Sequence, residues 1–231
     1  MKRVAVALYT LGLLTLVGTQ AHAAPIQPPI WTNNGDNVGF SWTADTVNGT
    51  GFVTYDDFSY ASDTLVNQVT WWGIFLTNPD LTNGPVNTSR WDVLINDASG
   101  PSGTPGPMVG GQVNATVQQT AVGNGFFGNN QVTVYKFVAD IPTFNAAGGS
   151  TYWFAPVNVS PDFSSFFSWI QGNGGDAAAF QVLLQNFVVT DTFDRPGDRA
   201  FELAATVPEP ATLTLLAIGL GGAAVRRRRR A

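Results

Sequence analysis

The feature that most constrains the fold is a series of short apolar runs separated by strong turn residues. Between residues 25 and 206, runs rich in β-branched and aromatic residues alternate with Gly, Asn, Asp and Pro. No helical apolar period continues there for longer than two turns. The spacing predicts an all-β fold, a single β-sandwich of jelly-roll type. Its strands are expected at 38–43, 51–55, 67–76, 90–96, 112–122, 131–140, 151–159, 180–189 and 199–204.

Three segments between these runs carry a different pattern. Residues 99–107 are rich in Gly and Pro, which predicts a surface loop. Residues 123–128 (GNGFFG) lack the Lys of a phosphate-binding loop and predict a hairpin turn. Residues 163–170 predict either a short helix or an irregular aromatic stretch.

The N-terminus has the three parts of a secretory signal. Lys2 and Arg3 precede an apolar run at 4–17, and Ala21 and Ala23 supply a small-x-small cleavage pattern. Residues 1–23 are therefore predicted to form a signal helix that signal peptidase removes after Ala23, or one residue later. The alternative is an uncleaved anchor, although the apolar run is shorter than the roughly 20 residues of a spanning helix.

The C-terminus also has three parts, in a fixed order. Pro208, Glu209 and Pro210 come first, and the uncharged run 211–225 follows as a predicted short transmembrane helix. As a helix this run would span about 22 Å, whereas the hydrocarbon core of a bilayer is about 30 Å thick. Snorkelling of the arginines and local thinning of the bilayer could close that gap. Positive residues beside a membrane segment resist translocation, so the terminal arginines are expected to stay in the cytoplasm. They are Arg226, Arg227, Arg228, Arg229 and Arg230.

This ordered combination at 207–231 resembles a PEP-CTERM sorting domain, a tail also labelled as an ice-binding protein C-terminal domain. The resemblance implies an exosortase-like processing enzyme of Gram-negative, polysaccharide-producing bacteria, which would cut near the motif. The ectodomain at 24–206 would then be anchored transiently in the inner membrane before it reaches the cell surface or the extracellular space. A permanent single-span anchor is the alternative.

The composition of the ectodomain removes most catalytic chemistry. The single histidine, His22, lies in the predicted signal, and the chain has no cysteine, which excludes Ser-His-Asp and Cys-His nucleophiles and the usual zinc ligands. Four basic and 15 acidic residues give the ectodomain a net charge of 4 − 15 = −11, so nucleic acid is not an expected partner. A carboxylate-dependent glycosidase is the remaining enzymatic alternative, with Glu202 as the single glutamate before the tail.

Two groups of side chains are candidates for ligand binding. Trp72, Trp153 and Trp169 could stack on sugar rings, although aromatic residues also fill sandwich cores. Asp191, Asp194 and Asp198 could bind calcium, although acidic turn residues facing water are the simpler interpretation. No other cofactor is expected.

We therefore expect an exported cell-surface or extracellular-matrix protein that is not an enzyme and has a structural or adhesion role. A glycan-binding module of the exopolysaccharide matrix is the first alternative, and a glycosidase is the second.

Overall fold

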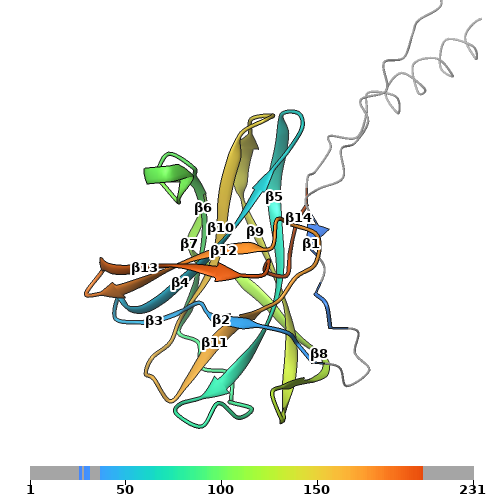
Figure 1. Ribbon diagram of the computed structural model, residues 1–231, viewed down its shortest axis with the longest axis vertical. Coiled ribbons are helices and arrows are strands. Elements are labelled where there is room, and N and C mark those ends of the chain that lie inside the picture. The colour runs from blue at the N-terminus through green and yellow to red at the C-terminus, as the bar shows by residue number, and fades with distance from the viewer. Residues whose placement is uncertain (1–25, 28, 32–36, 205–231) are drawn as a thin grey trace, which may run out of the picture.

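The computed structural model describes residues 26–27, 29–31 and 37–204, which form two seven-stranded sheets packed face to face (Figure 1). The first sheet contains β1 (Ile26–Gln27), β14 (Phe201–Ala204), β5 (Thr64–Thr77), β11 (Ser165–Ile170), β2 (Ser41–Thr43), β9 (Asn130–Ala146) and β8 (Val117–Phe127). The second contains β13 (Val188–Pro196), β12 (Ala178–Gln185), β4 (Thr50–Ser59), β3 (Asp45–Val47), β10 (Thr151–Val159), β6 (Arg90–Asp97) and β7 (Met108–Ala115). The predicted all-β sandwich is confirmed.

The first sheet is organised around β5, its central strand. One edge of β5 pairs with β9, which continues to β8. The other edge pairs first with β14 and then with β11, so these two short strands share the length of β5. The last strand of the described chain is therefore held inside a sheet, between β1 and β5.

The core between the sheets is mainly aromatic, because alternate residues of each strand point inward. Trp71 on β5 stacks on Phe137 of β9, with ring centroids 5.4 Å apart. Trp91 of the second sheet meets Phe167 of the first edge-to-face at 4.9 Å. These rings supply the large apolar burial that a chain without disulfides needs.

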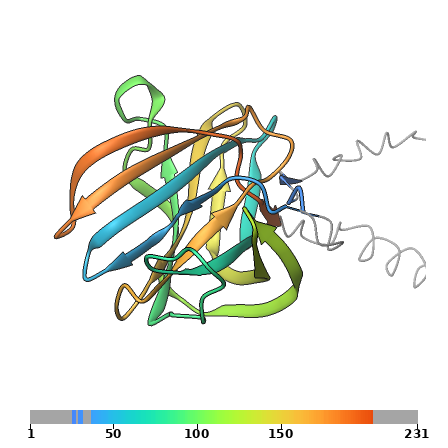
Figure 2. The same ribbon diagram turned by 60° about the horizontal axis from the view of Figure 1, so that its bottom comes forward.

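The second sheet is split in its middle by a short hairpin. β4 and β10 pair directly at one end, where Trp153 lies opposite Asp57. Farther along they separate, and β3 enters between them, antiparallel to β4 and parallel to β10. Figure 2 shows β13, β12, β4 and β3 side by side in this sheet.

The structure corrects several predicted element boundaries. Residues 163–170 contain β11, because Phe167 and Trp169 face the core while β11 pairs with both β5 and β2. The run predicted at 112–122 is divided between β7 and β8, and the run at 180–189 between β12 and β13. Residues 123–127 belong to β8 rather than to a turn.

Helix is scarce in the described part of the chain. The predicted loop at 99–107 holds the short 3₁₀ turn η1 (Pro101–Gly103). None of the helices within residues 26–27, 29–31 and 37–204 is long and apolar enough to cross a membrane. The predicted signal helix and the predicted membrane helix at 211–225 both lie outside these ranges.

Candidate functional site

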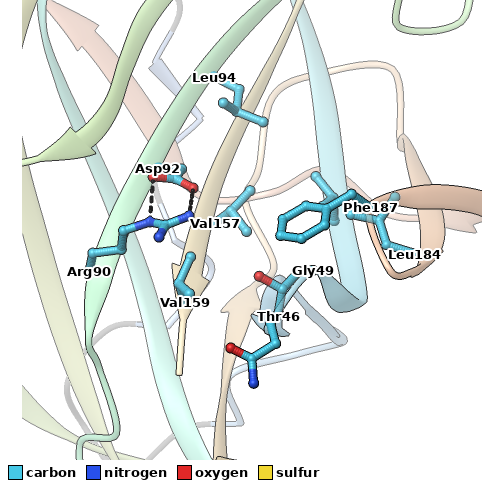
Figure 3. Close-up of a pocket in the computed structure, with 11 residues that line it drawn as sticks. Thr46, Gly49, Arg90, Asp92, Leu94, Val157, Val159, Leu184 and Phe187 are labelled. Carbon is cyan, nitrogen blue, oxygen red and sulfur yellow. Dashed lines mark hydrogen bonds and ion pairs between the residues drawn. The ribbon is translucent and has the colours of Figure 1, made fainter. Parts of the chain in front are cut away.

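A hollow of about 210 Å³ lies on the outer face of the second sheet, beside the point where β3 separates β4 from β10 (Figure 3). Strands β3, β4, β6, β10 and β12 all contribute to it, together with two hairpin turns. Its apolar lining is Val53, Leu94, Val157, Val159, Leu184 and Phe187. The hollow thus arises from the topology of the sheet itself.

The floor of the hollow is apolar and well packed. Val53 and Val157 are buried although they point away from the core between the sheets. They belong to a separate hydrophobic cluster on the outer face, in which Leu94 and Leu184 are half-buried. Leu94 and Leu184 are therefore the side chains of this cluster that an apolar ligand surface can still cover.

One wall carries an ion pair. The Arg90 guanidinium donates from Nε to Asp92 Oδ1 at 3.2 Å and from Nη2 to Oδ2 at 3.3 Å. Asp92 Oδ1 also accepts a hydrogen bond from the backbone N–H of Asn114 on β7, at 2.8 Å. The pair therefore presents fixed donors and acceptors at the edge of an apolar floor, as Figure 3 shows.

The opposite wall is formed by two turns that contact each other. The turn at Asn48 and Gly49 joins β3 to β4, with φ of 51° and 73°. Asn186 and Phe187 join β12 to β13, with φ of 51° and 65°. The Phe187 N–H donates to the Gly49 carbonyl oxygen at 2.8 Å. A Cβ at Gly49 would come within 2.6 Å of the Phe187 ring, so glycine is required beneath this ring.

A second hollow, of about 240 Å³, lies where Trp42 of β2 approaches β13. Arg195 is held there between two rings, with its guanidinium carbon 4.4 Å from the Trp42 centroid and 4.5 Å from that of Phe193. Its Nε and Nη2 both donate to Gln181 Oε1, at 2.9 Å and 2.8 Å. These contacts tie β2 to β13 and favour a structural role for this arginine.

The buried carboxylate of Asp45 joins the two sheets. Its Oδ2 accepts hydrogen bonds from Asn158 Nδ2 at 2.6 Å, from Ser160 Oγ at 2.8 Å and from the Phe167 N–H at 2.7 Å. Burial raises the pKa of Asp45 to about 7, against the opposing effect of these hydrogen bonds. These contacts hold β10, the adjacent Ser160 and β11 against β3, so we infer a structural role for Asp45.

A second buried charge cluster surrounds Arg199. Its side chain donates to four backbone carbonyl oxygens, those of Phe40, Trp169, Pro196 and Gly197. Burial lowers the pKa of Arg199 to about 10, and the nearby Asp56 and Asp198 oppose that shift. Burial also raises the pKa of Asp56. The Oδ2 of Asp56 accepts a hydrogen bond from the backbone N–H of Arg199. This network holds in place the segment around Arg199, which leads into β14.

The three tryptophans proposed for glycan binding lie in three different parts of the sandwich. Trp169 is fully buried between the sheets, against Phe154 and Phe201. Trp72 is half-buried on the outer face of the first sheet, where the Lys136 ammonium lies 5.6 Å from its ring centroid. Trp153 is half-buried on the outer face of the second sheet, and its Nε1 donates to the Gly103 carbonyl oxygen at 2.9 Å. The structure does not bring them together.

The three predicted calcium ligands are also separated. Asp191 and Asp194 are exposed on β13, and an odd spacing along a strand directs side chains to opposite faces. Asp198 is buried, and its carboxylate accepts the N–H groups of Gly175 and Ala177 at 3.0 Å and 2.7 Å. Across the described ranges, no three His, Cys, Asp or Glu side chains are grouped closely enough to hold a metal ion.

The side chains that line the hollow were not among the sequence-based candidates, although two signals for them exist. Arg90 and Asp92 are two residues apart in a predicted strand, which places them on one face. Asn186 begins a two-residue turn inside the run that was predicted as a single strand, and Asn favours positive φ at such turns. No local sequence pattern indicates that β3, β4 and β12 also contribute to the hollow.

The sorting and cleavage residues lie outside the described ranges: Ala21, Ala23, Pro208, Glu209, Pro210 and Arg226 to Arg230. Comparison with known proteins does reach the tail. Residues 206–230 match the family of the PEP-CTERM protein-sorting motif. No curated protein and no solved structure matches the chain.

The fold and the tail together define an exported β-sandwich protein that carries a C-terminal sorting signal. That signal is a PEP-CTERM motif, as the sequence resemblance predicted. The motif marks the chain for processing by an exosortase-type enzyme and for delivery to the cell surface or the extracellular space.

Proposed function

We propose that the chain is a non-catalytic structural or adhesion protein of the cell surface or extracellular matrix. In this proposal signal peptidase removes residues 1–23, and the tail holds the protein transiently in the inner membrane of a Gram-negative bacterium. The sandwich then holds matrix or surface material through the hollow of the second sheet. The β-sandwich supplies a rigid support for such a surface.

One observation carries this proposal: the charged side chains that line the hollow are Arg90 and Asp92, and they are paired with each other. Glycoside hydrolysis in its usual form needs two carboxyl groups flanking the scissile bond, one as acid and one as base or nucleophile. The lining supplies one carboxylate, and that carboxylate is already held by Arg90 and the Asn114 N–H. The arrangement favours binding over hydrolysis.

The experiment compares three strains of the producing bacterium: the parent, a deletion strain and the complemented deletion. We expect the deletion to lower the matrix polysaccharide retained per cell and surface attachment, and complementation to restore both. Purified protein should release no reducing ends from that polysaccharide. Unchanged retention and attachment in the deletion strain, or steady release of reducing ends, would contradict the proposal.

A further inference from the structure

We propose that the hollow beside β3 binds one pyranose ring of a neutral polysaccharide, with Phe187 as the stacking residue and the Arg90–Asp92 pair as the hydroxyl-binding wall. The proposal rests on the proposed function and adds the chemical class of the ligand. Three independent features of the hollow carry it: the conformation of Phe187, the division between polar and apolar lining, and the charge balance.

Phe187 occupies a backbone conformation that favours glycine. Its φ of 65° lies in the left-handed region, where a bulky L-residue is strained, and two-residue turns of this kind usually place Gly second. The strain is not offset by burial, because the residue is 75% exposed. Strained backbone positions cluster at functional sites, so an aromatic ring kept exposed at such a position supports a role in ligand contact.

The ring is directed into the hollow. Figure 3 shows Phe187 projecting from the β12–β13 hairpin toward Val157 and the ion pair. The ring lies over Gly49, and the N–H of Phe187 is fixed on the Gly49 carbonyl oxygen at 2.8 Å. The backbone of this wall is therefore fixed before a ligand binds, which reduces the entropy lost on binding.

The lining suits a ligand that is apolar on one face and polar at its edge. A pyranose ring has an apolar C–H face, which Phe187 and the half-buried Leu94 and Leu184 can cover. Its neighbouring hydroxyls can accept from the Arg90 guanidinium and donate to the Asp92 carboxylate. A volume of about 210 Å³ is small for a drug-sized ligand and suits one sugar unit of a chain.

The negative charge of the ectodomain favours a neutral sugar over an anionic one. Four basic and 15 acidic residues between 24 and 206 give a net charge of −11, which repels uronate and sulfate groups. Within the hollow, Asp92 already neutralises Arg90. An anionic ligand would therefore have to compete with Asp92 for that guanidinium.

The test uses protein purified from the surface fraction of the producing bacterium, in its processed form, with variants made in the same gene. Binding is measured by calorimetry and by ligand-detected NMR. The probes are maltohexaose, cellohexaose, mannohexaose, the neutral polysaccharide fraction of that bacterium and, as the anionic arm, hexagalacturonate. We expect saturable binding of a neutral probe, with a Kd of about 1 mM for a single ring contact.

Two variants, each with a matched control, assign the binding to the hollow. Phe187→Gly removes the ring and keeps the turn, so affinity should fall about tenfold or more while the protein stays folded. Phe163→Ala removes another exposed phenylalanine, 50% exposed and not part of the hollow, and should leave affinity unchanged. Arg90→Gln should weaken binding, whereas Lys136→Gln, which removes a positive charge from the other sheet, should not.

Any of three results would overturn the inference: no saturable binding of any neutral probe, equal affinity of wild type and Phe187→Gly, or tighter binding of hexagalacturonate than of every neutral probe. Failure of the inference is separable from failure of the proposed function. A protein that binds no sugar but is still needed for attachment refutes the ligand class alone. A protein that binds sugar while its deletion changes nothing refutes the role.

Discussion

Asp45 makes the stability of this fold depend on pH, because a buried carboxylate holds the two sheets together. Burial raises its pKa from 3.8 to about 7, so between these values the folded protein binds a proton that the unfolded chain has lost. The stability contributed by the protonated carboxyl is fully present below pH 3.8 and is lost as the pH rises through 7. Asp56 has a raised pKa for the same reason and acts with the same sign.

The free energy of unfolding should therefore fall by a few kcal/mol, up to about 4, between pH 4 and pH 7 through Asp45. Asp45→Asn keeps an oxygen acceptor for the three donors and cannot ionise, so its unfolding free energy should change less over this range. Asp45→Ala should be destabilised at every pH, because it leaves those donors unsatisfied. Urea titrations at several pH values measure this, and an equal pH dependence for wild type and Asp45→Asn would refute it.

Phe187 is the residue at which stability and binding are expected to oppose each other. Its positive φ costs energy that a glycine would not, while its exposed ring contributes little packing. Phe187→Gly should raise the free energy of unfolding by about 1 kcal/mol, even though it weakens binding. Thermal unfolding followed by circular dichroism checks this, and a clear loss of stability would show that the ring is needed for the fold.

At the scale of elements, β14 determines how the sorting tail leaves the folded domain. Phe201 and Leu203 are fully buried, and β14 pairs with β5 on one side and β1 on the other. The strand ends at Ala204, and the sorting motif begins at residue 206. The folded domain therefore continues almost to the start of the tail, so removal of the tail at or after its motif would leave the sandwich complete.

Loss of the core contacts of β14 should strongly destabilise the domain. The Phe201 ring packs against Phe154 and Trp169, with centroids 5.2 Å and 5.9 Å away. Phe201→Ala should cost about 3–5 kcal/mol of unfolding free energy. Phe163→Ala, at an exposed position, should change it by about 0.5 kcal/mol or less. Chemical denaturation compares the two, and similar effects would show that β14 is not an integral strand.

Element type was predictable where apolar runs are bounded by turn residues, as for β10, whose bounds 151–159 match the structure. The prediction of element type failed where the local sequence pattern was ambiguous. Ser165, Phe166, Phe167 and Ser168 lack an alternating pattern, and tertiary pairing with β5 and β2 makes them a strand. The hollow depends on the neighbours of β3, a long-range property that no local run of residues encodes.

At the scale of the whole molecule, a compact acidic sandwich precedes a basic tail. The ectodomain carries four of the 11 basic residues and 15 of the 16 acidic ones, and five arginines lie at 226–230. Such segregation suits a chain whose tail is retained at a membrane while its domain is exported. The tail was recognisable from its sequence because its motif, apolar run and charge are local features, whereas the ligand of the domain depends on the assembled sheets.

Intact-mass analysis of the protein from its native host tests the central claim, export followed by sorting, most directly. The account predicts a mass that lacks residues 1–23, or 1–24, and also lacks the five arginines at 226–230. It further predicts that this species is found at the cell surface or in the medium. Recovery of the chain with Arg226 to Arg230 still attached would contradict processing at the sorting motif and would indicate a permanent membrane anchor.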